Sequence, residues 1–352
     1  MKLEEAVKSI TGLDEAAMAE TWLLWDDKAK PLRSLGRLEE MVVTLAGIFG
    51  TTAPRIGKKG SIVMAADNGV IEEGVTQTGH EVTTTVTCNM AKGDATICVM
   101  SNVAGADVFP IDIGIMDEVD CPGVIDRKIM HGTDNMHKGP AMSRENAVKA
   151  IEVGIDFVME KAAEGYNIFA TGEMGIGNTS TSSAMAAVLL DVDVEKVTGR
   201  GSGLTSDALL HKIEVLKEAI ELNQPDKNDP IDVLSKVGGL DIAGLVGCFI
   251  GAAAAKVPIL IDGFISSVAA LAAVRIAPLC RNYMFPSHCS AEPAGHLVLE
   301  ALDMEAYIYA NMCLGEGTGA VTAMKLFDYA LECYYGIPNF TKANVQAYEH
   351  LK

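Results

Sequence analysis

The chain of 352 residues contains 49% hydrophobic and 21% charged residues and carries a formal net charge of −19. This composition is typical of a globular protein with a large core and excludes a disordered chain. The acidic balance argues against nucleic acid as a partner, because a phosphate backbone needs a basic surface, and any anionic ligand must be held by local donors.

The first half of the chain predicts a helical segment followed by alternating strands and helices. The expected elements are helices over 2–50 with breaks at Gly12, Pro31 and Gly36, a strand over 61–66, a helix near 81–105, a strand over 106–113, a polar segment over 115–142 and a helix over 143–164. Ser143 has the side chain preferred at a helix N-cap.

The second half continues the alternation. The expected elements are a strand over 166–170, a glycine-rich turn over 172–178, a helix ending near Leu190, helices over 205–222, 231–236 and 240–255, a strand over 257–261, an alanine-rich helix after 262–267, a strand over 283–285 and helices near 298–303 and 317–334. Uninterrupted apolar strands between helices are typical of a parallel sheet covered on both faces. The sequence therefore predicts an α/β fold, in which the helical N-terminal segment forms a smaller layer with the C-terminal tail.

The eight cysteines are scattered without any Cys-x-x-Cys pair, at positions 88, 98, 121, 248, 280, 289, 313 and 333. Since zinc sites need paired spacing, we expect reduced thiols and no metal site. The N-terminus lacks the apolar core of a signal peptide, and the longest uncharged apolar run, Ile242–Ala255, is shorter than the roughly 20 residues that cross a bilayer. These features predict a cytoplasmic protein without membrane contact.

A glycine-rich turn between a predicted strand and a predicted helix is the most informative motif. Gly172–Asn178 carries three glycines, and Thr179–Ser183 begins the helix with hydroxyl side chains only. The N–H groups of a first helical turn have no internal partner, and the helix dipole favours negative charge there. The motif predicts a phosphate site, although a turn that only allows close packing has the same composition.

Three further motifs carry reactive or anion-binding side chains. Gly199–Leu204 has three alternating glycines, and its arginine together with Lys212 supplies positive charge. Ser287–Pro293 is interpreted as substrate-positioning, because no nucleophile elbow surrounds its serine and histidine. Glu316 stands between glycines before a helix, where a carboxylate in an apolar pocket can act as a general base. The alternative for Glu316 is an ordinary glutamate stabilised by the helix dipole.

The segment after the first predicted strand, Asp67–Val70, separates this chain from two nucleotide-binding classes. It contains one glycine and so lacks the Gly-x-Gly-x-x-Gly fingerprint of a dinucleotide-dependent dehydrogenase. A P-loop is excluded because Gly57–Gly60 lacks the required spacing to Lys-Ser/Thr. Asp67 at the strand end and His80 before the next helix are further candidates for a site.

Taken in order along nearly the whole chain, these motifs resemble the nicotinate-nucleotide–dimethylbenzimidazole phosphoribosyltransferase family of cobamide synthesis. The matching segments are Gly172–Thr179, Gly199–Leu204, Val237–Leu240, Asp262–Ser266, Ser287–Pro293 and Leu314–Gly319, with Gly132–Asn135 and Gly139–Met142. The resemblance implies transfer of 5-phosphoribose from nicotinate mononucleotide to a lower-ligand base such as 5,6-dimethylbenzimidazole, with an α-ribotide and nicotinate as products. We expect no cofactor.

The resemblance also implies a fold, a dimer and a set of site residues. The fold is a Rossmann-like parallel sheet covered by helices in a large catalytic domain over 56–334, with a small helical domain from 1–55 and about 335–352. Glu316 matches the family's catalytic base. The residues expected to bind the substrate phosphate are Gly175, Ile176, Gly177, Asn178, Thr179, Gly201, Lys212 and Ser290, and those expected around the acceptor are Met174, Leu314, His80, Asp67 and Asn68.

Two positions depart from the family's pattern and leave alternatives open. Asn68 stands where the family usually has histidine, and His80 stands where it often has glutamine. One alternative is the branch of the family that uses phenol or p-cresol, forms an O-glycoside and works as a heterodimer of two related chains; there, His80 would help to polarise the phenolic hydroxyl. Another alternative is a non-catalytic partner subunit, against which the intact Glu316 motif argues.

Overall fold

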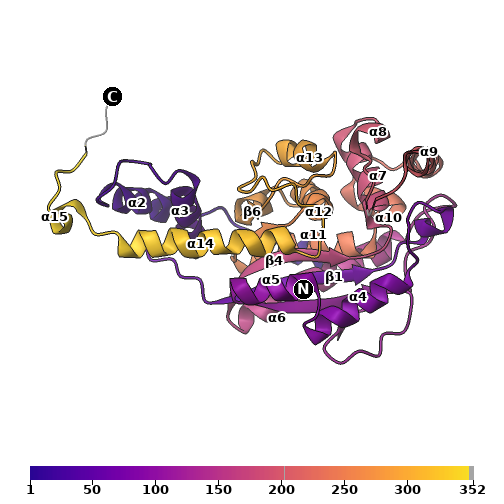
Figure 1. Ribbon diagram of the computed structural model, residues 1–352, viewed down its shortest axis with the longest axis horizontal. Coiled ribbons are helices and arrows are strands. Elements are labelled where there is room, and N and C mark those ends of the chain that lie inside the picture. The colour runs from indigo at the N-terminus through magenta and orange to yellow at the C-terminus, as the bar shows by residue number, and fades with distance from the viewer. Residues whose placement is uncertain (202, 349–352) are drawn as a thin grey trace.

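The computed structural model describes residues 1–201 and 203–348 and is built around a six-stranded parallel sheet (Figure 1). The strands lie in the order β3-β2-β1-β4-β5-β6. Their bounds are β1 Lys58–Ala66, β2 Ala106–Gly114, β3 Ile125–Asp126, β4 Tyr166–Met174, β5 Ile259–Ile261 and β6 Met284–Pro286. This is the doubly wound order in which the chain reverses direction across the sheet between β1 and β4, and ligands bind at the carboxyl ends of strands beside such a reversal.

Helices cover both faces of this sheet. Residues Gly60–Ala66 of β1 are therefore buried without alternation. The α-helices are α1 Leu3–Ser9, α2 Glu15–Asp26, α3 Arg37–Phe49, α4 Glu81–Lys92, α5 Thr96–Ala104, α6 Arg144–Ala163, α7 Asn178–Leu190, α8 Val194–Val197, α9 Ser206–Asn223, α10 Pro230–Val237, α11 Leu240–Ala255, α12 Phe264–Ile276, α13 Gly295–Ala301, α14 Thr318–Gly336 and α15 Phe340–Ala343. Two 3₁₀ segments are η1 Gly69–Glu73 and η2 Pro278–Tyr283. The predicted α/β fold is confirmed.

Glycine allows α6 and α11 to approach each other with their backbones in contact. A Cβ atom on Gly154 of α6 would collide with the carbonyl oxygen of Gly244, and one on Gly247 of α11 would collide with that of Ile151. This close packing holds α11 against β1 and β4, so the first turn of α11 lies near the carboxyl ends of these strands.

Several element boundaries differ from the sequence-based expectation. The single helix expected near 81–105 is two helices, because Gly93 adopts φ +86° and ends α4. Strand β4 continues through Gly172 to Met174, which were predicted to lie in the turn. The polar segment over 115–142 contains β3, a strand too short to leave a periodic pattern. By contrast, Ser143 is confirmed as the N-cap of α6, since its side chain accepts from Asn146 N.

Segments from both ends of the chain pack together beside the sheet. In Figure 1, α2, α3, α15 and the end of α14 lie together at the left. The rings of Trp25 and Tyr334 meet edge to face with centroids 5.0 Å apart, and Tyr334 donates a hydrogen bond to Thr52 O. Helix α1, however, packs on α6 and α11, where Lys2 pairs with Glu152. The division into a domain of 1–55 with 335–352 and a domain of 56–334 stays a prediction, and its residues 349–352 lie outside the described part.

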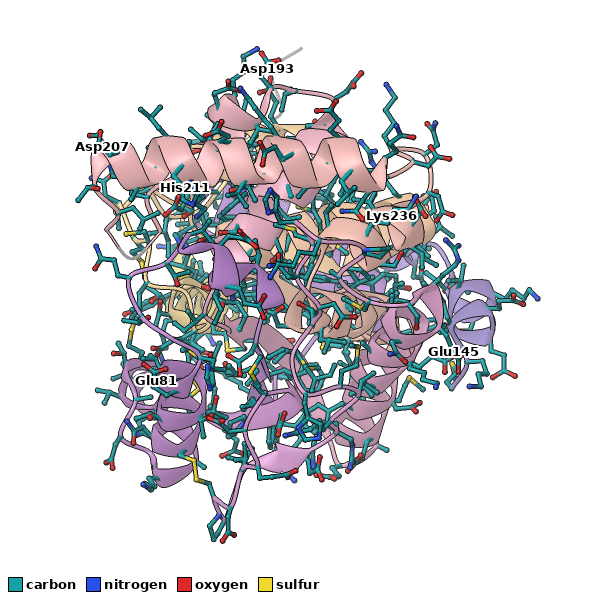
Figure 2. The ribbon with its side chains drawn as sticks, turned by 90° about the vertical axis from the view of Figure 1, so that its right-hand side faces the viewer. Glu81, Glu145, Asp193, Asp207, His211 and Lys236 are labelled. Carbon is teal, nitrogen blue, oxygen red and sulfur yellow. A yellow bond between two sulfur atoms is a disulfide. The ribbon has the colours of Figure 1, made fainter. Side chains whose placement is uncertain are left out.

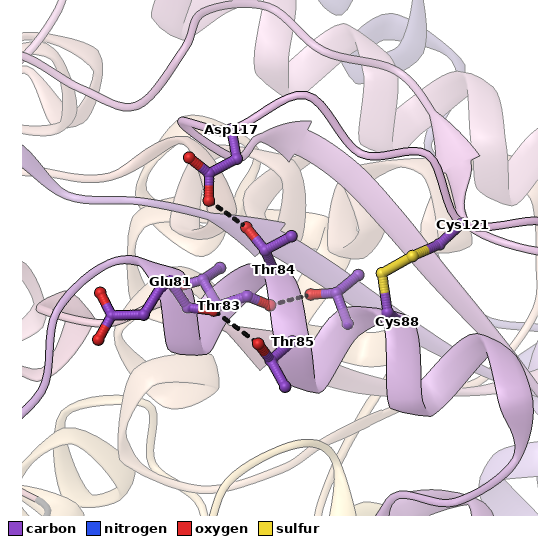
Figure 3. The surroundings of a disulfide bond; sticks show 8 residues. Glu81, Thr83, Thr84, Thr85, Cys88, Asp117 and Cys121 are labelled. Atoms are coloured by element: carbon purple, nitrogen blue, oxygen red, sulfur yellow. Dashed lines mark hydrogen bonds between the residues drawn. A yellow bond between two sulfur atoms is a disulfide. The ribbon is translucent and has the colours of Figure 1, made fainter.

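The expectation of reduced thiols is wrong for two cysteines, because Cys88 of α4 and Cys121 form a disulfide (Figure 3). Their Cα atoms are 5.7 Å apart although 33 positions separate them in sequence. Only folding brings α4 and the loop after β2 together, so no local spacing reveals this pair. The six other cysteines are free. Among residues 1–201 and 203–348, no helix combines the length and apolar composition needed to cross a membrane.

Candidate active site

A cavity of about 310 Å³ opens at the carboxyl ends of β4, β5 and β6. Its size falls in the range of small-molecule sites. The expected site residues on its wall are Met174, Gly175, Ile176, Gly177, Asn178, Thr179, Gly201, Lys212, Ser290, Leu314 and Glu316. The parallel sheet therefore brings together motifs that are more than a hundred positions apart in sequence.

The segment Met174–Thr179 forms one wall of the cavity and is held from behind by two side chains. Ile176 N donates to Thr83 Oγ1 at 3.1 Å, and Asn68 Nδ2 donates to Ile176 O at 3.3 Å. Gly177 adopts φ +94° as the N-cap of α7, a conformation that side chains other than glycine rarely adopt. The loop thus presents the start of a 13-residue helix to the cavity.

Lys212 of α9 supplies a buried cation beside that helix start. Its Nζ donates to Thr179 Oγ1 at 2.9 Å and to Gly199 O at 3.4 Å. Burial lowers the pKa of Lys212 to about 8, and the carboxylate of Glu292 raises it in part. Figure 2 shows α9 lying across the molecule, and His211, next to Lys212, contacts Glu73 O through its Nε2 at 2.7 Å. A lysine and a helix N-terminus that meet at one point favour an anion.

The other basic residue of this region is bound within its own loop. Arg200 donates to Leu204 O at 2.6 Å and to Ser206 Oγ at 3.1 Å. Ser202 of the same motif lies outside the described residues. Ser290 Oγ accepts from Glu292 N at 3.3 Å. Lys212 is therefore the stronger candidate for an anion contact.

Glu316 lies on the cavity wall, in a strained turn that packs against the end of β4. Gly315, Glu316 and Gly317 adopt φ +85°, +60° and +94°, so the unusual backbone angles expected from the glycines are confirmed. A glutamate at positive φ costs on the order of 1 kcal/mol, and such strain is concentrated at functional sites. Glu316 Oε2 accepts from Ile97 N at 3.3 Å, and burial raises the pKa of its carboxyl group. A raised pKa suits a group that takes up a proton near neutral pH.

Sequence reasoning missed a second carboxyl group, Glu173, at the end of β4. Burial and, less strongly, the charge of Asp241 on α11 raise the pKa of Glu173 to about 8. Asn178 Nδ2 joins the two groups: it donates to Glu173 Oε2 and, at 3.0 Å, to Asp241 Oδ2. Burial raises the pKa of Asp241 to about 7. Glu173 stands inside a predicted motif at a strand end, which is a usable signal, whereas nothing local identifies Asp241.

Asp262, which also lines the cavity, was missed as well, whereas His288 beside it belongs to the segment interpreted as substrate-positioning. Asp262 follows β5 and accepts from Gly317 N at 3.1 Å and from Ala320 N at 3.0 Å. Burial raises the pKa of Asp262, and His288, whose Nδ1 is 4.0 Å from Asp262 Oδ1, opposes this. Asp262 thereby anchors the turn that carries Glu316. The position of Asp262 directly after a predicted strand is the signal that could have identified it.

Three residues expected around an acceptor do not line the cavity. Asp67 is buried, and its carboxylate accepts from Met116 N at 2.8 Å. Asn68 is buried behind the loop that contains Ile176. His80 Nε2 lies 3.5 Å from Asp117 Oδ1, with 39% of the His80 side chain exposed. Met174 and Leu314 remain as the acceptor candidates on the cavity wall.

Known proteins resemble this chain over its whole length. A family model described as phosphoribosyltransferase matches residues 10–345. A nicotinate-nucleotide–dimethylbenzimidazole phosphoribosyltransferase of Ruminiclostridium cellulolyticum is 50% identical over 352 residues and covers 100% of both chains. One of Acetivibrio thermocellus is 51% identical over 347 residues and covers 99% of both chains.

A solved structure agrees with these relatives. The crystal structure of CobT from Thermus thermophilus superposes with a TM-score of 0.89 at 35% identity, and the match covers 94% of this chain and 99% of that one. The strand order, the cavity and these matches lead to one conclusion: this chain belongs to the nicotinate-nucleotide–dimethylbenzimidazole phosphoribosyltransferase family.

Proposed function

We propose that this protein transfers 5-phosphoribose from nicotinate mononucleotide to 5,6-dimethylbenzimidazole or a related aromatic base, releasing nicotinate and an α-ribotide. The observation that carries the proposal is that an anion-suited helix start with Lys212 and a buried carboxyl group, Glu316, line one cavity. The names of the relatives at 50% and 51% identity support the donor and the acceptor.

The chemistry of the donor explains why one carboxylate suffices. The bond between carbon 1 of the ribose and the pyridinium nitrogen breaks, and nicotinate leaves with a neutral ring, so no acid is needed. One ring nitrogen of the acceptor forms the new bond to carbon 1 with its free lone pair, and the other ring nitrogen loses its proton to Glu316. Orientation of donor and acceptor in one cavity supplies much of the acceleration.

The remaining wall residues divide between the two substrates. In this proposal the donor phosphate binds the loop and the cation beside it, through Gly175, Ile176, Gly177, Asn178, Thr179, Gly201, Lys212 and Ser290. Met174 and Leu314 contact the flat acceptor ring. Asn68 supports the loop from behind, the carboxylate of Asp67 accepts from Met116 N, and His80 lies next to Asp117.

We also propose that two copies of the chain form a homodimer. Apolar side chains are exposed on α5 and α14, which pack against each other: Val99 is 61% exposed, Val103 73% and Tyr329 62%. Solvent exposure of such side chains on neighbouring helices is typical of an interface. A heterodimer with a related chain is the competing assembly.

The test replaces Glu316 with glutamine and measures product formation from nicotinate mononucleotide, with dimethylbenzimidazole and phenol assayed in parallel. We expect wild-type protein to use dimethylbenzimidazole and E316Q to lose about 10²–10⁴-fold in kcat, since a glutamine accepts no proton. Glu332→Gln, at an exposed position of α14, is the matched control and should keep full activity.

Near-normal turnover of E316Q would remove Glu316 from the role of base. Turnover with phenol alone would assign the chain to the phenolic branch. Binding of nicotinate mononucleotide without turnover of either acceptor would support a non-catalytic subunit.

A further inference from the structure

Two buried oxygen atoms behind the 174–179 loop lack a hydrogen-bond partner. They are Asp241 Oδ1 and Asn68 Oδ1, and both residues are 0% exposed. A Cβ atom on Gly239 would lie 2.5 Å from the first oxygen and 2.6 Å from the second, so both oxygens border the same space beside Gly239. Buried polar atoms are rarely left unpaired, because this costs about 1–3 kcal/mol each.

The other atoms of both side chains are already engaged, which fixes their orientation. Asn68 Nδ2 donates to Ile176 O, so the amide oxygen of Asn68 is the atom that faces Gly239. Asp241 Oδ2 accepts from Asn178 Nδ2 at 3.0 Å. If Asp241 is ionised, two acceptors face each other in a buried place without a hydrogen between them.

We propose that Asp241 is held protonated and donates its hydrogen to Asn68 Oδ1, which makes Asp241 a positioning residue for the cavity carboxyl group Glu173. One proton then satisfies both unpaired oxygens. This inference rests on the proposed function only for the role of Glu173, not for the proton on Asp241.

The surroundings of Asp241 favour its neutral form. Burial is the main cause that raises the pKa of Asp241. The charged neighbour that raises it is another carboxylate, Asp67. Asn178 and the N–H groups at the start of α11 act in the opposite direction, toward the ionised form. Glu173 from β4 adds a second carboxyl group on the other side of Asn178.

A proton on Asp241 has a consequence inside the cavity. Asn68, Asp241, Asn178 and Glu173 then form one continuous hydrogen-bonded line that ends at the cavity wall. With Asp241 neutral, the like charge that most opposes ionisation of Glu173 is removed, and Asp262 is the remaining acidic neighbour that raises its pKa. Glu173 then ionises near neutral pH as a second carboxylate beside the substrates.

The variant Asp241→Asn tests the proposal, because asparagine has the shape and neutrality of a protonated aspartate. Its amide can donate to Asn68 Oδ1 while its oxygen accepts from Asn178. We expect kcat/KM within about threefold of wild type and an acid limb of the pH profile that moves by less than about half a pH unit. Asp207→Asn in the first turn of α9, an exposed position, controls for the loss of a helix N-terminal charge.

A shift of that limb to lower pH by about one unit or more in D241N would overturn the proposal, since it would mean that an ionised Asp241 had been raising the pKa of Glu173. The infrared difference between wild-type protein and D241N gives a second readout without substrate. We expect a protonated-carboxyl band in the wild type that moves in D₂O. An ionised-carboxylate band instead, as with a bridging buried water, would also overturn it.

If D241N does not fold, Asn68→Ala replaces it in the infrared measurement. The protonated-carboxyl band should then shift, because the O–H group loses its acceptor, and an unchanged band would contradict the proposal. The infrared result is independent of phosphoribosyl transfer, so failure of the proposed function and failure of this inference are distinguishable.

Discussion

At the scale of single residues, burial sets the ionisation of the groups that line the cavity. It lowers the pKa of Lys212 to about 8, raises that of Glu173 to about 8 and raises that of Glu316. Desolvation disfavours the charged form of both acids and bases, so Lys212 and Glu173 exchange protons near neutral pH. Glu316 could be predicted from its flanking glycines. Asp241 has no local sequence signal, and it is identified only by its hydrogen bond with Asn178 in the structure.

Lys212→Met is expected to weaken binding of the donor. The change removes a buried cation while keeping a side chain of similar length, and a charged hydrogen bond contributes about 1.5–3 kcal/mol, which corresponds to a rise in KM of about ten- to a hundredfold. In wild-type protein, KM for nicotinate mononucleotide should rise as pH passes above about 8, because Lys212 then loses its proton. The measurement is KM against pH.

The matched control is Lys217→Met, an exposed lysine on the same helix that pairs with Glu195. It should leave KM unchanged. A KM of K212M equal to that of wild type at every pH would show that the donor phosphate binds elsewhere.

At the scale of elements, α4 connects the disulfide to the cavity. Cys88 near its end is bonded to Cys121, Thr83 accepts from Ile176 N, and Val86 lines the cavity. Figure 3 also shows Asp117 accepting from Thr84, a second link between α4 and the loop after β2. The helix was predicted but not its break at Gly93 or its covalent link, since both depend on partners outside the segment.

Cys121→Ser is expected to lower the midpoint of thermal unfolding. A cross-link over 33 positions restricts the unfolded chain, and its loss typically costs about 2–4 kcal/mol. Reductant should lower the midpoint of wild-type protein to that of C121S and leave C121S unchanged. Cys333→Ser, which removes a free thiol, is the control. If reductant does not change the midpoint of thermal unfolding of the wild-type protein, the two cysteines are not bonded in solution.

At the scale of the whole molecule, the strand order decides where the site lies. β1 pairs with β2 on one side and with β4 on the other, and the cavity lies on the β4 side of this reversal, at the carboxyl ends of β4, β5 and β6. Helix α5 connects the cavity to the surface of the molecule. Ile97 N at its start donates to Glu316 Oε2, whereas Val99 and Val103 of the same helix are exposed. A dimer formed through α5 would therefore affect where the Glu316 side chain is held.

Val103→Lys is expected to convert a dimer into single chains, because a charge cannot be buried unpaired at an apolar interface. Light scattering coupled to size-exclusion chromatography measures the mass of each species. Val345→Lys, an exposed valine of the C-terminal segment, should keep the dimer. A V103K variant with the mass of the wild-type dimer would locate the interface elsewhere.

The sequence by itself determined the α/β alternation, the glycine turns and the family, because these rest on periodicity, on backbone freedom and on motifs that are contiguous in the chain. The positions of Glu316, Lys212 and the 172–178 turn in one site followed from those motifs. Only the tertiary structure decided what supports them. Asn178 and Asp241 are 63 positions apart, and Cys88 and Cys121 are 33 apart. The first pair meets because glycines let α11 pack against α6 beside the sheet, and the second because α4 packs on β2. Neither packing event leaves a local pattern in the sequence.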